Sequence, residues 1–205
     1  MRLTTVSRVT AGLLLALAPL ALTACGSSGS PQAAAATTTA PAMPSLAGQP
    51  TVVLTRFAKY SSTAQAITYN TTRVPVGADV SVVQLQGGGG TLTVLAVHGL
   101  PANQQFGAHV HQNACGKSPE DAGSHYQHKV DPKQPSVNPA YANAQNEIWL
   151  DFTTDNNGFG HAVSTVAWMF DNRPHKSIVI HAQHTITTPG KAGTAGDRLA
   201  CINLS

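Results

Sequence analysis

The sequence predicts an all-β domain, a sandwich or barrel of about eight strands, in residues 51–205. Three observations support this fold class. No stretch of the domain keeps the hydrophobic period of an amphipathic helix, and short runs rich in valine, isoleucine and threonine occur instead. Turn residues separate these runs at short intervals, as in sandwiches and barrels. The length of about 155 residues is that of one domain.

Each strand is predicted where β-branched residues lie between turn signals. Four glycines at residues 87–90 mark a hairpin between the second and third strands. The Asp-Asn-Asn-Gly stretch at residues 155–158 marks another hairpin. In chain order, the predicted strands cover residues 52–54, 80–85, 92–97, 106–112, 147–153, 161–166, 177–181 and 199–204.

One segment fits no strand. Residues 116–145 are polar and contain Pro119, Pro132, Pro135 and Pro139. A loop of roughly 30 residues inside a compact domain is uncommon and is often functional. We therefore expect a single long proline-rich loop that contributes to a site.

The N-terminus is predicted to be a lipoprotein signal peptide, residues 1–24. Arg2 and Arg8 precede an apolar run at residues 11–18 that is too short to cross a bilayer. The Leu-Thr-Ala-Cys stretch that ends at Cys25 resembles the bacterial lipobox, in which the cysteine is acylated and becomes the mature N-terminus. The protein is then exported and anchored by lipid to the outer face of the cell membrane. The alternative is an ordinary signal peptide in which Cys25 carries no lipid.

Residues 25–50 contain mainly serine, glycine, alanine, threonine and proline. Such a composition cannot bury a core. We interpret this segment as a disordered tether between the lipid and the domain.

Composition excludes a nucleic-acid binder. Only 10% of residues are charged, the formal net charge is +3, and no basic stripe is present. No apolar stripe indicates a particular oligomer.

The chain has three cysteines, Cys25, Cys115 and Cys201. If Cys25 carries lipid, one pair remains for a disulfide, which an exported protein can form. By chain entropy, a bridge that closes a loop this long stabilises the fold by about 4 kcal/mol.

The histidines indicate a metal site. His109 and His111 are two apart on a predicted strand, so both imidazoles project from one face while Val110 faces the core. His125 lies in the long loop, and His181 ends an apolar strand. Neutral imidazole suits copper, zinc, iron and nickel, and copper binds tightest at equal access. Taken singly, each histidine is more often exposed or hydrogen-bonded.

Several motifs in order resemble the copper/zinc superoxide dismutase family: His109-Val110-His111, Cys115, the Gly-Ser-His stretch ending at His125, Ile180-His181, and Ala195-Gly196-Asp197-Arg198-Leu199-Ala200-Cys201. The last is the most specific. The resemblance covers roughly residues 51–205 and implies an eight-stranded Greek-key β-sandwich or barrel. It further implies dismutation of superoxide to dioxygen and hydrogen peroxide at a copper ion.

The resemblance also assigns residues to roles. Copper would be held by His109, His111, His125 and His181. Cys115 and Cys201 would form the disulfide. Arg198 would lie beside copper and guide the anion, since a guanidinium is always charged and offers a fork of donors.

The sequence departs from the zinc-containing members of that family. The loop from residue 129 to 145 has no histidine to complete a zinc site, and the segment from His181 to Arg198 is short and lacks an aspartate soon after the histidine. Both losses resemble the copper-only branch. In that branch a glutamate orients the histidine that matches His125. Glu147 is our candidate, with Asp151 as the alternative.

Three functions remain open at this point. The first is a copper-only superoxide dismutase. The second is a copper-plus-zinc dismutase whose rearranged zinc site uses His125, His128 and an acidic residue. The third is a copper-binding module of the cell envelope with little or no dismutase activity. His128 and His184 are expected to be exposed or accessory ligands, and we assign no role to His98, His161 or His175.

Overall fold

The computed structural model describes residues 48–204, and their regular elements are nine strands and one short 3-10 helix. The predicted all-β fold is confirmed. The elements are β1 (Thr51–Ala58), β2 (Ala66–Thr68), β3 (Asp79–Gly87), β4 (Gly90–His98), β5 (Gln105–His111), η1 (Pro119–Ala122), β6 (Phe152–Thr153), β7 (Gly160–Val166), β8 (Ser177–His181) and β9 (Arg198–Asn203). The predicted signal peptide, Cys25 and most of the predicted tether lie outside the described residues. Within residues 48–204, no helix has the length and apolar character needed to cross a membrane.

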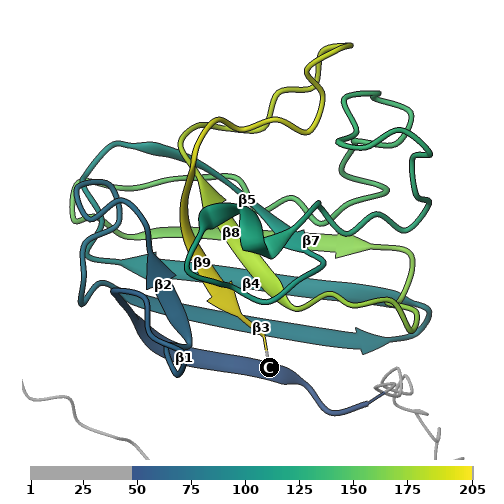
Figure 1. The fold of residues 1–205 in the computed structure, drawn as a ribbon. Coiled ribbons are helices and arrows are strands. Elements are labelled where there is room, and N and C mark those ends of the chain that lie inside the picture. The colour runs from purple at the N-terminus through teal and green to yellow at the C-terminus, as the bar shows by residue number, and fades with distance from the viewer. Residues whose placement is uncertain (1–47, 205) are drawn as a thin grey trace, which may run out of the picture. The chain divides into compact units, whose positions relative to one another are not determined.

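The strands form one continuous sheet that curls into a nearly closed barrel of two layers (Figure 1). Its order is β6-β5-β8-β9-β2-β1-β3-β4-β7. One layer contains β1, β3, β4 and β7, and the other contains β5, β8, β9 and β2. The short parallel pairing of β1 with β2 joins the layers.

The chain crosses between the layers instead of pairing each strand with its successor. β4 pairs with β7, whereas β5, which follows β4 in sequence, pairs with β8. β8 then pairs with β9, and β9 with β2. These crossings leave long connections outside the sheet, and the connections before β6 and after β8 project from the same end of the barrel (Figure 1).

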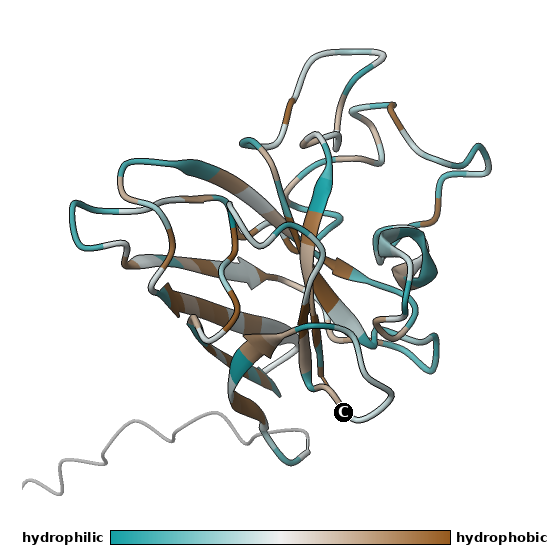
Figure 2. Ribbon diagram, turned by 60° about the vertical axis from the view of Figure 1, so that its left-hand side comes forward, coloured by the Kyte–Doolittle hydropathy of each residue, from teal (hydrophilic) through white to brown (hydrophobic). Residues whose placement is uncertain are grey.

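Alternation of apolar and polar residues explains why β3, β4 and β7 form strands. Their buried and exposed residues alternate strictly along most of each strand, and Figure 2 shows the same alternation in hydropathy. The buried set includes Val80, Val82, Leu95 and Val97, which pack in the main core. These strands therefore have one face in the core and one in solvent.

β5 and β8 differ because both of their faces are covered. Phe106, Ala108 and Val110 of β5 lie in the core, while His109 and His111 on the opposite face are also buried. Loops cover that second face. The predicted arrangement of the two histidines on one strand face is confirmed.

The structure differs from the sequence prediction at two strands. β2 was not predicted, because three residues are too few to show a period. The predicted strand at 147–153 is regular only at β6. Trp149 still forms a bridge to His109 in the same register, so the strand is interrupted around Leu150 and Asp151. The long proline-rich loop is confirmed, and it contains η1.

A disulfide joins Cys115 to Cys201 and so ties the start of the long loop to β9. Cys201 is completely buried and packs with Ala122 and Val179 in a second, smaller apolar cluster. The bridge spans 86 residues, a loop long enough to stabilise the fold by about 4.6 kcal/mol on the chain-entropy model.

Candidate metal centre

The pairing of β5 with β8 brings three histidines to one face of the sheet. His181 lies opposite Gly107 in the antiparallel register, and Gly107, His109 and His111 alternate along the same face of β5. His181 therefore projects beside the two histidines of β5. The ring centroids of His109 and His181 are 4.9 Å apart.

The fourth histidine comes from the long loop. His125 forms an isolated β-bridge with His111, and Gln112 donates its backbone N–H to the carbonyl of Ser124. These bonds fold the loop back onto the end of β5. Each of the four imidazoles then offers one nitrogen to a common centre, and these nitrogens all lie within 4.8 Å of one another.

The hydrogen bonds of the four rings fit a bound metal ion. In each ring the nitrogen that faces away from the centre has a partner: Thr185 Oγ1 for His109 Nε2 at 2.7 Å, the Gly123 carbonyl for His111 Nδ1 at 3.0 Å, Glu147 Oε2 for His125 Nδ1 at 2.8 Å and the Gly196 carbonyl for His181 Nδ1 at 3.2 Å. Three of the inward nitrogens, His109 Nδ1, His111 Nε2 and His181 Nε2, are buried without any partner. Buried polar atoms normally have one. A metal ion would satisfy them, and an all-imidazole donor set suits copper.

Three of the rings are held neutral. Burial, followed by repulsion from His125, lowers the pKa of His109 and of His111 well below the ordinary value. Burial likewise lowers the pKa of His181 to about 3. At neutral pH their inward nitrogens are therefore lone pairs, the form that binds a metal.

Glu147 is the hydrogen-bond partner of His125, and its side chain is only 2% exposed. Its carboxylate also accepts hydrogen bonds from Gln127 Nε2 and Trp149 Nε1, both at 2.7 Å. Three donors compensate the buried charge. Of the two candidates from the sequence, the structure places Glu147 on His125.

Asp151 serves a different ring. Its two carboxylate oxygens accept hydrogen bonds from the backbone N–H and the hydroxyl of Thr185. Thr185 is the residue that contacts His109. The carboxylate expected behind His125 is thus matched by a second one behind His109.

Arg198 begins β9 and lies at the edge of the centre. One guanidinium nitrogen donates to the carbonyl of Pro119 at 3.1 Å and another to that of Gly123 at 2.9 Å. Its side chain is 18% exposed, and the exposed Glu120 lies 3.5 Å away. Because the Gly123 carbonyl also accepts from His111, the arginine is held in register with a histidine of the cluster.

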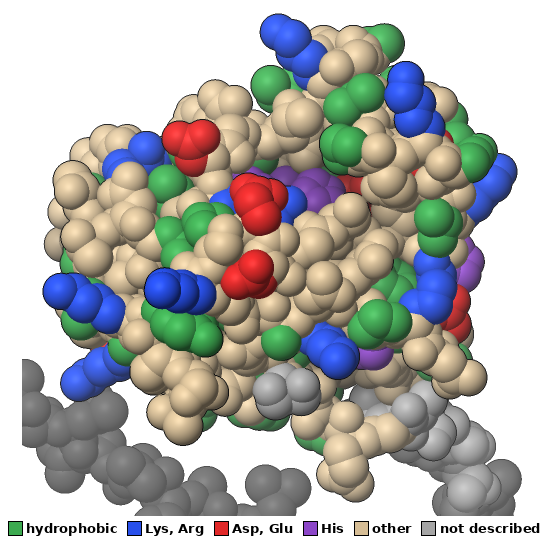
Figure 3. All heavy atoms as spheres, viewed as in Figure 1, with side chains coloured by type: hydrophobic (Ala, Val, Ile, Leu, Met, Phe, Trp, Pro, Cys, Tyr) green, Lys and Arg blue, Asp and Glu red, His purple; other side chains and the backbone are tan. Residues whose placement is uncertain are grey.

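A cavity of about 210 Å³ connects the centre to solvent. It is lined by His125, His181, Glu147 and Arg198, together with further residues of the loop between β5 and β6 and of the loop between β8 and β9. Histidine side chains are visible in a hollow on this face of the molecule (Figure 3). The site is therefore open to a small solute.

The remaining histidines lie elsewhere. His128 is exposed and stacks on Trp168, and His184 bonds to the carbonyl of Phe152. His98 and His161 are exposed, and His175 stacks on Phe170. Among residues 48–204, the four-histidine cluster is the one group of three or more His, Cys, Asp or Glu side chains that could hold a metal ion, and His128 does not belong to it.

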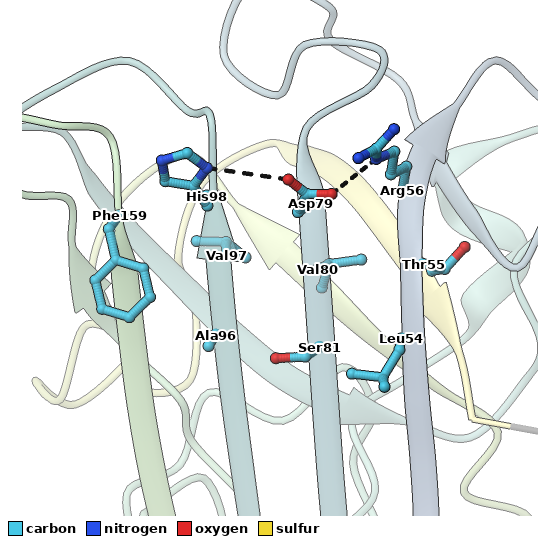
Figure 4. Close-up of a pocket in the computed structure, with 10 residues that line it drawn as sticks. All are labelled: Leu54, Thr55, Arg56, Asp79, Val80, Ser81, Ala96, Val97, His98 and Phe159. Atoms are coloured by element: carbon cyan, nitrogen blue, oxygen red, sulfur yellow. Dashed lines mark hydrogen bonds and ion pairs between the residues drawn. The ribbon is translucent and has the colours of Figure 1, made fainter.

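A second hollow, of about 390 Å³, lies on the outer face of β1, β3 and β4. Figure 4 shows Asp79 there between Arg56 and His98, with Leu54 and Phe159 nearby. None of the four clustered histidines lines it. We do not assign it to the metal centre.

Three residues of the centre were missed from the sequence: Thr185, Gln127 and Trp149. Trp149 had a usable signal, because it is two residues after Glu147 in an alternating stretch and therefore shares its face. Thr185 and Gln127 lie in loops, where no period reports which way a side chain points.

Comparisons with known proteins agree with this centre. The family model described as copper/zinc superoxide dismutase (SODC) matches residues 76–204, more than half of the chain. No curated protein matches the sequence.

Solved structures similar to this chain share its fold at low identity. A Cu/Zn superoxide dismutase from Brucella abortus is 17% identical, with a TM-score of 0.51, over 77% of this chain and 100% of that one. A double mutant of a SOD-like protein from Bacillus subtilis is 17% identical, with a TM-score of 0.50, over 68% of this chain and 94% of that one. The clock protein EA4 is 17% identical, with a TM-score of 0.50, over 75% and 93%.

The geometry predicts the metal content of the protein. After exposure to both copper and zinc followed by removal of loosely bound ions, we expect one copper and no zinc per chain. The outward nitrogen of His125 is occupied by Glu147, and no second cluster exists among the described residues. Elemental analysis by mass spectrometry measures both metals. One stoichiometric zinc per chain would contradict the prediction.

Proposed function

The chain belongs to the copper/zinc superoxide dismutase family, and we therefore propose that it dismutes superoxide with copper alone, outside the cytoplasmic membrane. The observation that supports this most directly is the set of three buried, unpartnered imidazole nitrogens beside the guanidinium of Arg198. A redox metal and an anion-binding group then meet in one cavity.

Bound copper would supply the one-electron chemistry in which one superoxide is oxidised to dioxygen and a second is reduced to hydrogen peroxide with two protons. Zinc has no redox chemistry and could not replace it. His109, His111, His125 and His181 would hold the ion. Hydrogen bonds on their outward nitrogens keep the inward lone pairs aimed at it.

Arg198 would attract and orient the anion. Its guanidinium shares a cavity with His125 and His181, and two backbone carbonyls hold it in place. A fixed positive charge in the wall of a cavity focuses the field on small anions and raises their local concentration. The cavity of about 210 Å³ has room for a diatomic anion.

Glu147 would hold His125 in its orientation without a second metal ion. Its carboxylate keeps the proton of His125 on Nδ1 and leaves Nε2 as the ligand atom. Gln127 and Trp149 fix the carboxylate in turn. This arrangement favours function with copper alone.

The first experiment measures superoxide consumption by the copper-loaded protein. We expect the wild type to be active and His111→Ala to lose nearly all activity, because one of the four ligands is missing. His161→Ala is the matched control, since His161 is exposed on β7 and does not belong to the cluster. Wild-type activity no higher than that of His111→Ala would favour the copper-binding module instead.

The second experiment tests electrostatic guidance. Arg198→Ala should lower the rate of superoxide consumption by roughly tenfold at low ionic strength, the lower end of the range for electrostatic steering. It should also flatten the decline of the rate with added salt, while copper stays bound. Arg198→Lys keeps the charge and should keep the salt dependence. Equal salt dependence in wild type and Arg198→Ala would exclude a guiding role.

The location forms part of the proposal. A lipid on Cys25 would anchor the protein outside the cytoplasmic membrane, and the Cys115–Cys201 disulfide is of the kind found in oxidising compartments. Mass spectrometry of protein purified from its own host should find the mature chain beginning at an acylated Cys25. A mature chain with unmodified Cys25, or one that begins elsewhere, would contradict the anchor.

A further inference from the structure

The hydroxyl of Thr185 lies between a histidine and a carboxylate. It is 2.7 Å from Nε2 of His109 and donates a hydrogen bond of 2.6 Å to Oδ1 of Asp151. The backbone N–H of Thr185 donates to Oδ2 of the same carboxylate at 2.7 Å. Asp151 therefore grips Thr185 at two points, and Thr185 contacts His109.

The direction of each hydrogen bond follows from the chemistry of the groups. A hydroxyl has one proton, and the carboxylate of Asp151 can only accept it. Towards His109, Thr185 can then only accept a hydrogen bond. The proton of His109 is held on Nε2, and Nδ1 is left as the lone pair that faces the centre without a partner.

His109 differs from the other three rings in the nitrogen that it presents to the centre. The other three histidines bond outward through Nδ1 and present Nε2, whereas His109 presents Nδ1. A proton on the wrong nitrogen of His109 would point into the cluster and block the ion. Backbone carbonyls fix His111 and His181, whereas side chains fix His125 and His109.

The fold brings the three groups together from distant segments. His109 is on β5, Asp151 precedes β6, and Thr185 follows β8. Gly107 makes the approach possible, because a Cβ there would come within 2.6 Å of the carbonyl oxygen of Gln183. The loop after β8 therefore lies directly against β5.

We propose that Thr185 and Asp151 are positioning residues for copper, acting through His109: they select its Nδ1 as the ligand atom and fix the ring. This inference rests on the proposed copper site and adds to it a hydroxyl–carboxylate relay from the loop after β8 and the segment before β6. The sequence lacks the aspartate expected soon after His181, and Asp151 supplies a carboxylate by way of Thr185. Linked hydrogen bonds of this kind also polarise one another and raise the basicity of the nitrogen that would bind copper, here Nδ1 of His109.

The experiment measures copper binding without relying on catalysis. Thr185→Val has nearly the same shape as threonine but accepts no hydrogen bond. We expect it to weaken Cu(II) affinity by about 10- to 100-fold in competition with a chelator, the usual effect of losing such a partner. It should also alter the electron paramagnetic resonance spectrum of bound Cu(II). Thr185→Ser keeps the hydroxyl and should restore both properties.

Two further variants complete the design. Thr187→Val makes the same substitution at an exposed position in the same loop and should leave affinity and spectrum unchanged. Asp151→Asn replaces one carboxylate oxygen, an acceptor, with an NH2 group that donates. Like Thr185→Val, it should weaken copper binding. Thermal unfolding of the copper-free proteins identifies any variant that has lost its fold, and Asp151→Asn then replaces Thr185→Val in the comparison.

The outcomes separate the relay from the proposed activity. Wild-type affinity and spectrum in both Thr185→Val and Asp151→Asn would overturn the relay, even if the wild type is an active dismutase. Weakened binding that Thr185→Ser restores would support the relay, even if the copper-loaded wild type consumes no superoxide.

Discussion

Four imidazoles, three of them buried, each turn one nitrogen toward a common centre and place the other nitrogen in a hydrogen bond. All four acceptors belong to two connections, the loop between β5 and β6 and the loop between β8 and β9. Gly123 and Glu147 belong to the loop between β5 and β6, and Gly196 to the loop after β8. His109 bonds to Thr185 in that same second loop. The cluster therefore determines how both loops are folded over the sheet.

This constraint explains why the outward face of β5 and β8 is covered although no second sheet packs there. Gly107 leaves room for the loop after β8, and the disulfide ties the other loop to β9. The two loops are also linked to each other, because the backbone N–H of Gly190 donates a hydrogen bond of 3.1 Å to the carbonyl of Val137. The two loops that line the cavity therefore contact each other as well as the histidines.

The site contains two charged side chains that are largely buried, Glu147 and Arg198. Glu147 is almost fully buried and has three donors, so its charge is compensated without a second metal ion. Arg198 is held by two carbonyls, one of which it shares with His111. The positive charge of Arg198, which lines the cavity together with His125 and His181, attracts anions toward the histidines.

The sequence alone determined most of the strands, because alternation along β3, β4 and β7 reports directly on burial. It also determined that His109 and His111 share a face, since the period of a strand is two. It left open whether Glu147 or Asp151 supports His125, and it gave no sign of Thr185. Only the tertiary structure decided these points: the residues lie in loops or at the interruption near Leu150, where no period fixes the direction of a side chain. Contacts between distant segments placed Glu147 behind His125, and Asp151 behind His109 through Thr185.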